Sequence, residues 1–325
     1  MKAWQVSAAG EPESMTLAEV ADPRPGPTQV RIRVQAAGLN FFDILQIQGK
    51  YQDRPPYPFT PGAEVAGTVQ AVGEEVTQFI PGDAVMAFTW GGGMAESALA
   101  SAAWTFRIPP GLDVVEAAAM PIVYHTSWYA LRNRAGLIAG EWLLVHAGAS
   151  GVGMSAIQIG KALGARVIAT AGNPEKRAFA LSQGADHTLD YRDDKWVEEA
   201  KDLTGAGADV IYDPVGGDIF DLSTRCIASE GRLLVIGFAA GRISTIPANR
   251  VLLKNMSVVG VFWGAHSRRN PGFVAETQEE LNAMFKAGQM RPVVGATYPL
   301  AAAPRALRDL AERKVSGKAV LVMSA

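Results

Sequence analysis

A glycine-rich turn between an apolar strand and a helix is the strongest chemical signal in the sequence. Trp142–His146 predicts a buried strand, Gly148–Gly153 reads Gly-Ala-Ser-Gly-Val-Gly, and Met154–Leu163 continues with helical character. Glycines let the backbone approach a pyrophosphate, which then lies at the positive N-terminus of the helix. The spacing is not GxGxxG, and a tight turn without a ligand is the alternative. The flanking strand and helix favour a dinucleotide site, with phosphate contacts from Ser150, Gly151 and Val152.

The end of the next predicted strand, Val167–Thr170, indicates which dinucleotide binds. A site for NAD usually places an Asp or Glu about 20 residues beyond the turn, where it binds the ribose 2′-hydroxyl. Here the strand continues into Gly172 and Asn173 without an acid, and Lys176 and Arg177 open the following helix. These features fit a 2′-phosphate, so the sequence predicts NADPH rather than NADH. The alternative is that Lys176, and even more so Arg177, is a solvated helix residue.

The elements that must position this turn alternate regularly through the middle of the chain. From about residue 112, short apolar strands alternate with helical stretches, which predicts an α/β fold with a doubly wound parallel sheet. The first 110 residues or so are instead rich in strands and turns. Gln29–Ala36 alternates apolar and polar residues with period two, whereas Asp22–Pro27 contains too many prolines for a helix.

Composition excludes several classes of protein. A chain of 325 residues predicts about two domains. The net charge of -2 gives no footprint for nucleic acid or an anionic membrane. Cys226 is the single cysteine, so no intramolecular disulfide or cysteine-cluster metal site is possible, and the four histidines lack metal-ligand spacing. Without a signal peptide or an apolar run of about 18 residues, we expect a cytoplasmic, metal-free protein.

The chain resembles the medium-chain dehydrogenase/reductase superfamily and, within it, the zinc-independent quinone oxidoreductase (zeta-crystallin) family. The family signature is matched around the glycine turn, where Ser150 replaces the first of two paired glycines. The matching residues are Gly140, Glu141, Leu144, Gly148, Ala149, Gly151, Val152, Gly153, Gln158 and Lys161. Further landmarks occur in family order at Gly38–Asp43, Pro61–Gly67, Pro81–Asp83 and Gly317-Lys318.

The resemblance implies a GroES-like β-rich catalytic domain formed by residues 1–120 and 265–325, with a Rossmann NADPH-binding domain at 121–264 inserted between them. In zinc-dependent relatives, a Cys and a His bind the catalytic zinc at places that match Asn40 and Ala63 here. Neither side chain can replace those ligands, and the four-cysteine structural lobe is missing. We therefore expect no metal and no zinc-dependent alcohol chemistry.

The resemblance also implies further site residues. Thr126 matches a threonine near the nicotinamide, Tyr191 a tyrosine beside the adenosine, and Asn40 a position that contacts the substrate or the ribose. Tyr51 matches a tyrosine on the substrate side and would orient or protonate the substrate oxygen. Backbone segments beside the nicotinamide are expected at Gly237, Phe238 and Phe262.

Each of these assignments has a structural alternative. Tyr191 and Phe262 could simply pack, and Tyr51 and Asn40 could have purely structural roles. Asp43 is read as a scaffold contact rather than a base.

Together these features predict an NADPH-dependent reductase that transfers hydride to an electron-poor acceptor. Quinone reduction is the first reading. Reduction of the conjugated double bond of an enone or 2-alkenal is the second, and a non-catalytic NADPH-binding protein is the third. We expect a homodimer, because the apolar segment Ser257–Val261 would otherwise leave a sheet edge open.

Overall fold

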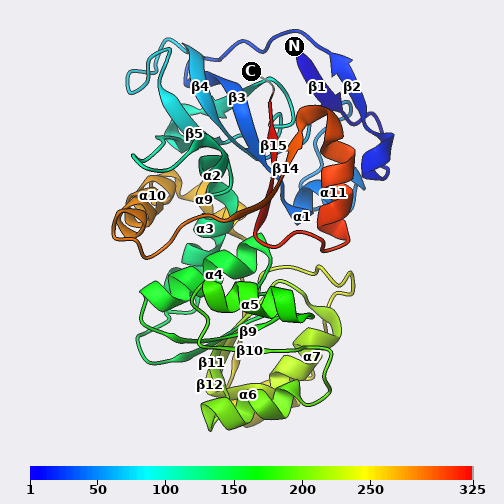
Figure 1. The fold of residues 1–325 in the computed structure, drawn as a ribbon, viewed down its shortest axis with the longest axis vertical. Coiled ribbons are helices and arrows are strands. Elements are labelled where there is room, and N and C mark those ends of the chain that lie inside the picture. Colours follow the sequence, from blue (N-terminus) through cyan, green and yellow to red (C-terminus); the bar gives the residue numbers. More distant parts are fainter. Residues whose placement is uncertain (324–325) are drawn as a thin grey trace. The chain divides into compact units, whose positions relative to one another are not determined.

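The computed structural model describes residues 1–323, and the chain divides into two compact units. Unit 1 comprises Met1–Ile122 and Pro292–Ala325, and unit 2 comprises Val123–Arg291. The chain therefore leaves unit 1 near the predicted boundary at residue 120 (Figure 1). It returns at Pro292 rather than at the expected residue 265.

The late return has a packing reason within unit 2. The helices α9 (Trp263–Arg269) and α10 (Pro271–Lys286) carry His266 and Phe273, whose rings both contact that of Tyr129. The ring of His125 lies 5.5 Å from that of Trp263. Because these aromatic contacts hold α9 and α10 against the start of unit 2, residues 265–291 belong to that unit.

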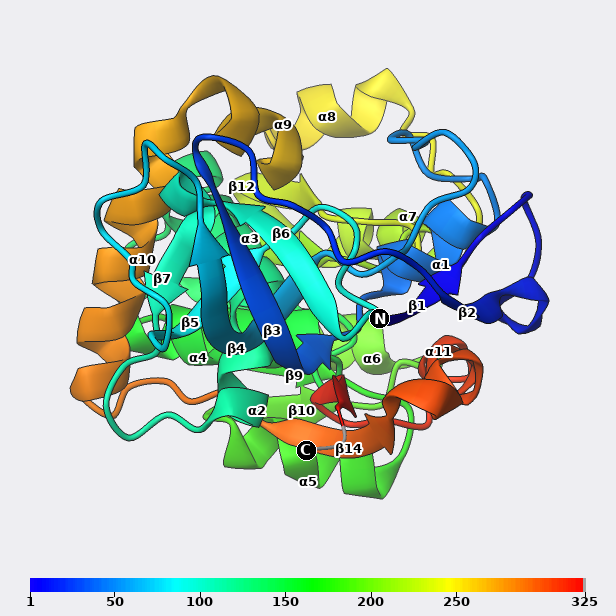
Figure 2. The same ribbon diagram turned by 90° about the horizontal axis from the view of Figure 1, so that it is seen from above.

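Unit 1 is built around a seven-stranded sheet in the order β14-β15-β3-β4-β5-β7, with β6 also pairing β3. All neighbours are antiparallel except β14 and β15. Figure 2 shows β3, β4 and β5 side by side. The strands are β3 (Gln29–Gly38), β4 (Glu64–Val72), β5 (Ala84–Phe88), β6 (Ser97–Ser101), β7 (Thr105–Arg107), β14 (Val294–Pro299) and β15 (Lys318–Val322).

A small antiparallel ribbon and several helices complete unit 1. The ribbon pairs β1 (Lys2–Gln5) with β2 (Thr16–Glu19). The α-helices are α1 (Phe41–Ile47), α2 (Val114–Ala118) and α11 (Ala303–Ala311). Short 3-10 turns are η1 (Pro12–Ser14), η2 (Ala102–Trp104) and η4 (Leu300–Ala302). The period-two pattern predicted β3 correctly, because its alternate residues Val30, Ile32 and Val34 are buried in the core of this unit.

Unit 2 contains a six-stranded sheet in the order β10-β9-β8-β11-β12-β13, and every pair is parallel. Counted along the chain this is the order 3-2-1-4-5-6 of a doubly wound dinucleotide-binding fold, as predicted. All four residues of β8 are buried, as expected of a central parallel strand covered on both faces. The strands are β8 (Trp142–Val145), β9 (Arg166–Thr170), β10 (His187–Leu189), β11 (Ala208–Asp213), β12 (Ile227–Val235) and β13 (Ser257–Gly260).

Helices cover both faces of this sheet, with α4 and α5 on one face and α6 and α7 on the other (Figure 1). These helices are α4 (Gly151–Ala162), α5 (Pro174–Ser182), α6 (Trp196–Thr204) and α7 (Gly217–Cys226). The unit also contains α3 (Pro121–Trp128, which begins in unit 1), the π-helical turn η3 (Tyr129–Arg134) and α8 (Ala248–Lys254). Within residues 1–323, no helix has the length and apolar character needed to cross a membrane.

Candidate active site

The predicted glycine turn connects β8 to α4 and is shaped by backbone contacts. A Cβ on Gly153 would lie 2.2 Å from the carbonyl oxygen of Ala147, and one on Gly148 would lie 2.8 Å from the Cβ of Ala169. Only glycine fits at either place. Ala147 itself has a φ of 51°, in the left-handed region. The turn is thus a tight strand-to-helix connection that needs two of its glycines for steric reasons.

Ser150 is the N-cap of α4, and both its hydroxyl and its backbone N–H form hydrogen bonds within the turn. Its Oγ accepts a hydrogen bond from Gly153 N–H at 3.1 Å and donates one to Ala147 O at 2.8 Å. Its backbone N–H also donates to Ala147 O. In residues 1–323, the N–H groups of Gly151 and Val152 have no acceptor, and both residues are partly exposed. The first turn of α4 therefore offers two backbone donors, and the dipole of this helix favours an anion there.

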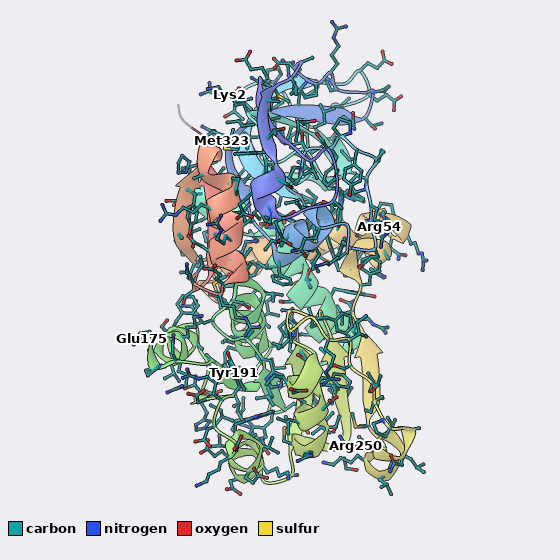
Figure 3. The ribbon with its side chains drawn as sticks, turned by 90° about the vertical axis from the view of Figure 1, so that its right-hand side faces the viewer. Lys2, Arg54, Glu175, Tyr191, Arg250 and Met323 are labelled. Atoms are coloured by element: carbon teal, nitrogen blue, oxygen red, sulfur yellow. The ribbon has the colours of Figure 1, made fainter. Side chains whose placement is uncertain are left out.

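The residues after β9 form the second part of the predicted site. Asn173 caps α5, and its Oδ1 accepts from the Lys176 N–H at 2.8 Å. A Cβ on Gly172 would lie 2.9 Å from the Tyr191 hydroxyl oxygen, so Tyr191, which follows β10, lies directly against this glycine (Figure 3 labels Tyr191). The structure brings together Gly172, Asn173, Lys176 and Tyr191.

Arg177 is engaged in an ion pair beside this group. Its guanidinium lies 2.7 Å from Asp190, which also binds Arg192 at 3.0 Å. These two guanidinium groups help to lower the pKa of the Asp190 carboxyl, although its desolvation acts in the opposite direction. Arg177 is thus already paired with a carboxylate.

Thr126 is a partly exposed residue on the otherwise buried helix α3. It is the one residue from Pro121 to Ala130 that is not buried. Its neighbour Ser127 is buried and lies 2.9 Å from the Tyr212 hydroxyl and 2.7 Å from the Ser155 hydroxyl. This network ties α3 to β11 and α4, so the Thr126 side chain is presented from a rigid, enclosed helix.

Gly237 and Phe238 directly follow β12, and Phe262 follows β13. Phe238 and Phe262 are 38% and 40% exposed. The predicted residues of unit 2 other than Thr126 thus follow the carboxyl ends of the parallel strands. Strand order reverses between β8 and β11, and ligands of such sheets bind at this edge.

Sequence reasoning missed Asp213 at the same edge. Asp213 is the last residue of β11, and its buried carboxylate accepts hydrogen bonds from the N–H groups of Val215 and Gly216 at 2.8 and 2.9 Å. Burial raises the pKa of Asp213 to about 6 against the opposing effect of these two donors. Its role is to order the turn into α7, and no local pattern of residue types distinguishes it from an ordinary strand end.

The two predicted residues of unit 1 flank α1. Asn40 is the N-cap of this helix, and Tyr51 follows its C-terminal end and stacks on Phe42 with ring centroids 5.3 Å apart. Asp43 returns a hydrogen bond to the helix start, since its Oδ2 accepts from the Asn40 N–H at 2.7 Å. Burial raises the pKa of Asp43 to about 7.

A buried ionic cluster around Asn40 was not foreseen. The Lys318 ammonium donates to Asn40 Oδ1 at 2.8 Å, to Leu39 O at 2.8 Å and to Glu64 Oε1 at 2.7 Å. Glu64 also accepts from Asn40 Nδ2 at 2.7 Å and from the Ile122 N–H at 2.8 Å. Lys318 is 2% exposed and Glu64 0%. Gly317-Lys318 stood out only as a family landmark, because 278 residues separate Lys318 from Asn40.

The donor set around Asn40 does not suit zinc. Zinc sites use Cys, His and carboxylate ligands, whereas this place holds a carboxamide and Ala63. The Glu64 carboxylate beside them is already paired with the buried Lys318 ammonium, which would repel a second cation. Across the described part of the chain, no group of three or more His, Cys, Asp or Glu residues has the arrangement of a metal site.

Family profiles cover most of the chain. A profile described as alcohol dehydrogenase GroES-like domain matches residues 26–110, and one described as zinc-binding dehydrogenase matches residues 151–279. The second profile is named for zinc, but Asn40 and Ala63, which the family resemblance aligns with the zinc ligands of metal-dependent members, lie outside its range and differ from those ligands in chemistry.

Individual relatives extend over nearly the whole chain. Quinone oxidoreductase-like protein 2 homolog of Nematostella vectensis is 39% identical over 91% of this chain and 82% of its own length. Quinone oxidoreductase of Pseudomonas aeruginosa is 37% identical over 99% of both chains.

Solved structures agree with the sequence relatives. Escherichia coli quinone oxidoreductase complexed with NADPH has a TM-score of 0.92 and 28% identity, covering 99% of this chain and 100% of that one. The CurK enoyl reductase has a TM-score of 0.90 and 28% identity, covering 99% of both chains. The chain therefore belongs to the zinc-independent quinone oxidoreductase family of the medium-chain dehydrogenase/reductase superfamily, a family of oxidoreductases.

Proposed function

We propose that this protein is an NADPH-dependent, zinc-independent reductase that transfers hydride to a quinone. The observation that carries the proposal is the edge of the parallel sheet in unit 2. There, two N–H groups that have no acceptor within residues 1–323, a lysine and a tyrosine lie after successive strands. The NADPH complex of the Escherichia coli relative and the names of the relatives support the same assignment.

The chain's own residues suit each part of the cofactor. The N–H groups of Gly151 and Val152 would bind the pyrophosphate at the start of α4. Tyr191 would lie beside the adenosine, and Gly172 keeps it there because the glycine has no side chain to displace the ring. Lys176 would neutralise the 2′-phosphate and thereby select NADPH over NADH.

We assign the nicotinamide end of the cofactor to partly exposed residues, one of which lies on a helix that is otherwise buried. Thr126 would hydrogen-bond near the nicotinamide from the enclosed helix α3, and the segments at Gly237, Phe238 and Phe262 would pass beside the ring. When bound, NADPH supplies a hydride, and the protein contributes orientation and hydrogen bonds.

Unit 1 supplies the groups proposed to act on the substrate oxygen. One Nδ2 proton of Asn40 is committed to Glu64, and the second is chemically available to an oxygen acceptor of the substrate or the ribose. Tyr51 would orient the substrate or deliver a proton to its oxygen, and its stacking on Phe42 fixes the ring. The hydride and this proton together supply the two electrons and two hydrogens that convert the quinone to its hydroquinone.

Reduction of a conjugated carbon–carbon double bond is the second candidate activity. It is favoured by the likeness to the CurK enoyl reductase, which extends over the whole fold. The same cofactor residues would serve both reactions, and hydride would then be added to the carbon β to the carbonyl.

NADPH oxidation by the purified protein tests these activities. Parallel reactions would contain 1,4-benzoquinone, 9,10-phenanthrenequinone or a 2-alkenal, with NADH replacing NADPH as the control. Turnover of a quinone with NADPH supports the proposal, whereas turnover of the alkenal alone supports the second candidate. NADPH binding without turnover of any acceptor would contradict both activities and favour a non-catalytic NADPH-binding protein.

We also propose that the protein is a homodimer formed through β13. This strand is the last of the sheet in unit 2 and pairs with β12 on one side. Val258 on β13 is 38% exposed, and an exposed apolar edge strand is a template for pairing with another chain.

A further inference from the structure

The Lys318 ammonium is held by a complete set of acceptors inside unit 1. Its three protons match three oxygens, which belong to Leu39, Asn40 and Glu64 and lie 2.7–2.8 Å away. The side chain is 2% exposed. A buried ammonium in this geometry has no proton left for another partner, so Lys318 itself is an unsuitable ligand or proton donor.

The cluster decides which way the Asn40 carboxamide points. An ammonium can only donate, so the atom facing Lys318 must be the carbonyl oxygen Oδ1. The Glu64 carboxylate only accepts, so the atom facing it must be the nitrogen Nδ2. Reversing the amide would place a donor against a donor and an acceptor against an acceptor. The orientation of Asn40 is therefore fixed by chemistry at both ends.

Backbone contacts fix the same group from behind. Asp43 accepts the Asn40 N–H at 2.7 Å, and the Asn40 C=O accepts the Asp43 N–H at 3.1 Å. Glu64 is held in turn by the N–H of Ile122. Asn40 is 6% exposed, so only a small part of this firmly held residue is accessible to a ligand.

We propose that Lys318 and Glu64 are positioning residues that hold Asn40 as a fixed hydrogen-bond donor toward an oxygen atom of the bound ligand. The inference rests on the proposed function, in which Asn40 contacts the acceptor or the ribose. Both possible partners present oxygen acceptors, namely the carbonyl of the quinone and the hydroxyls of the nicotinamide ribose. The ion pair thus acts on the reaction through Asn40 and not by direct contact.

A purely stabilising role makes a different prediction, because replacing a buried ion pair with neutral side chains is often tolerated. The paired substitution Glu64→Gln with Lys318→Met removes both charges without leaving either one alone. The amide introduced by Glu64→Gln can present either an oxygen or a nitrogen, so the Asn40 carboxamide is no longer held in one orientation. A stabilising pair would change the melting temperature alone, whereas a positioning pair changes ligand recognition as well.

The test is a mutant cycle on the full-length protein. Four forms are compared: wild type, Asn40→Ala, the paired variant, and the paired variant combined with Asn40→Ala. We expect Asn40→Ala and the paired variant each to lower kcat/KM for 9,10-phenanthrenequinone by about 10-fold, as expected for one lost hydrogen bond. In the Asn40→Ala background, the paired substitution should lower kcat/KM by less than about 2-fold, because the group it positions is gone.

The mutant cycle distinguishes a failure of the positioning role from a failure of the proposed contact between Asn40 and a ligand. Equal losses from the paired substitution with and without Asn40 would overturn the positioning role while leaving the proposed function intact. If Asn40→Ala changes neither kcat/KM nor the Kd of NADPH, the proposed contact of Asn40 with a ligand is wrong. Lys314→Met is the matched control, since this exposed lysine pairs with Asp309 and Glu312 and should leave the kinetics unchanged.

A measurement on the wild-type protein covers the case in which the paired variant does not fold. The ¹H–¹⁵N signals of the Asn40 carboxamide are identified by their loss in Asn40→Ala. Addition of NADP⁺ alone, or of 9,10-phenanthrenequinone after NADP⁺, should shift one of the two Nδ2 proton signals. A shift with NADP⁺ assigns the partner to the ribose, and a shift only with the quinone assigns it to the acceptor. Unchanged signals in both additions would overturn the inference.

Discussion

Lys318 and Glu64 form an ion pair in which the ammonium nitrogen lies 2.7 Å from the carboxylate oxygen, although 254 residues separate them in the sequence. The pair joins β15 to the start of β4, and both strands pair with β3 in the same sheet. Because the side chains are 2% and 0% exposed, neither charge can be solvated if the other is removed.

The ion pair predicts that removing one charge lowers the free energy of unfolding more than removing both. Lys318→Met alone should lower the free energy of unfolding by about 3–5 kcal/mol, because it leaves a buried carboxylate without its cation. Pairing it with Glu64→Gln should recover part of that loss. Urea unfolding monitored by tryptophan fluorescence measures both values. A single variant as stable as wild type would show that the carboxylate is better solvated than its burial implies.

Lys176 should determine the preference for NADPH. Lys176→Ala should raise the Kd of NADPH about 10- to 100-fold, the loss expected for a charge-assisted hydrogen bond. The Kd of NADH should be unchanged, since NADH has no 2′-phosphate. Both are measured by the quenching of protein fluorescence. Lys195→Ala, at an exposed position just before α6, is the control, and an unchanged NADPH Kd in Lys176→Ala would refute the assigned 2′-phosphate site.

Gly172 should matter through Tyr191. In Gly172→Ala the new Cβ would lie 2.9 Å from the tyrosine hydroxyl, so the ring must move away from the position proposed for the adenosine. We expect a Kd for NADPH raised about 10-fold or less with little change in melting temperature, because a side-chain end can shift without disturbing the backbone. Gly272→Ala is the control, since its Cβ would meet no atom within 4 Å. Equal NADPH affinity in both variants would contradict the role of Tyr191.

His146 should contribute to the loss of stability in acid. Ser223 Oγ donates to Ile219 O, so it accepts from His146 Nε2, and Thr170 donates to Nδ1. Burial lowers the pKa of this neutral imidazole from 6.5 to about 3. The unfolded chain therefore binds a proton that the folded chain does not, and stability falls as the pH decreases from 6.5 to about 3.

Replacing this residue isolates its contribution. Between pH 5 and 4, the free energy of unfolding of wild type should fall more steeply than that of His146→Gln, by up to about 1.4 kcal/mol per pH unit. His187→Gln is the control, since His187 is exposed. Chemical denaturation at a series of pH values gives both slopes. Parallel slopes for wild type and His146→Gln would mean that His146 is protonated in the folded protein.

The proposed dimer depends on β13. Val258→Lys places a charge on the exposed edge strand and should convert the dimer to a monomer. Thr188→Lys changes β10, the strand at the opposite edge of the same sheet, and should leave the dimer intact. Light scattering at micromolar concentration distinguishes the two masses. A monomeric wild-type protein would refute the proposed homodimer outright.

The sequence by itself determined the parts of the protein that depend on local pattern. The apolar strand Trp142–Val145, the glycine turn and the helix from Gly151 follow one another within a few residues, so their steric requirements are visible in the chain. The cofactor candidates after β9 were also found from local features, namely the lack of an acid at the end of this strand and the basic residues that open the following helix.

Local pattern was insufficient where packing rather than periodicity decides the element. The helices α1 and α9 are seven residues long, and β6 is a short strand that pairs with β3, from which β4 and β5 separate it along the chain. The predicted domain boundary lies at residue 265, whereas the second compact unit of the structure extends to Arg291. Nothing in the composition of α9 and α10 indicates that the His266 and Phe273 rings pack against Tyr129 of unit 2.

Only the tertiary structure revealed the environment of Asn40. The sequence singled out this residue, but not the ammonium and the carboxylate that fix its amide, because they come from β15 and β4. Hydrogen bonds between side chains depend on distances of about 3 Å and leave no periodic trace in a sequence. Residue type thus identified which groups are available, and the folded sheet decided which of them meet.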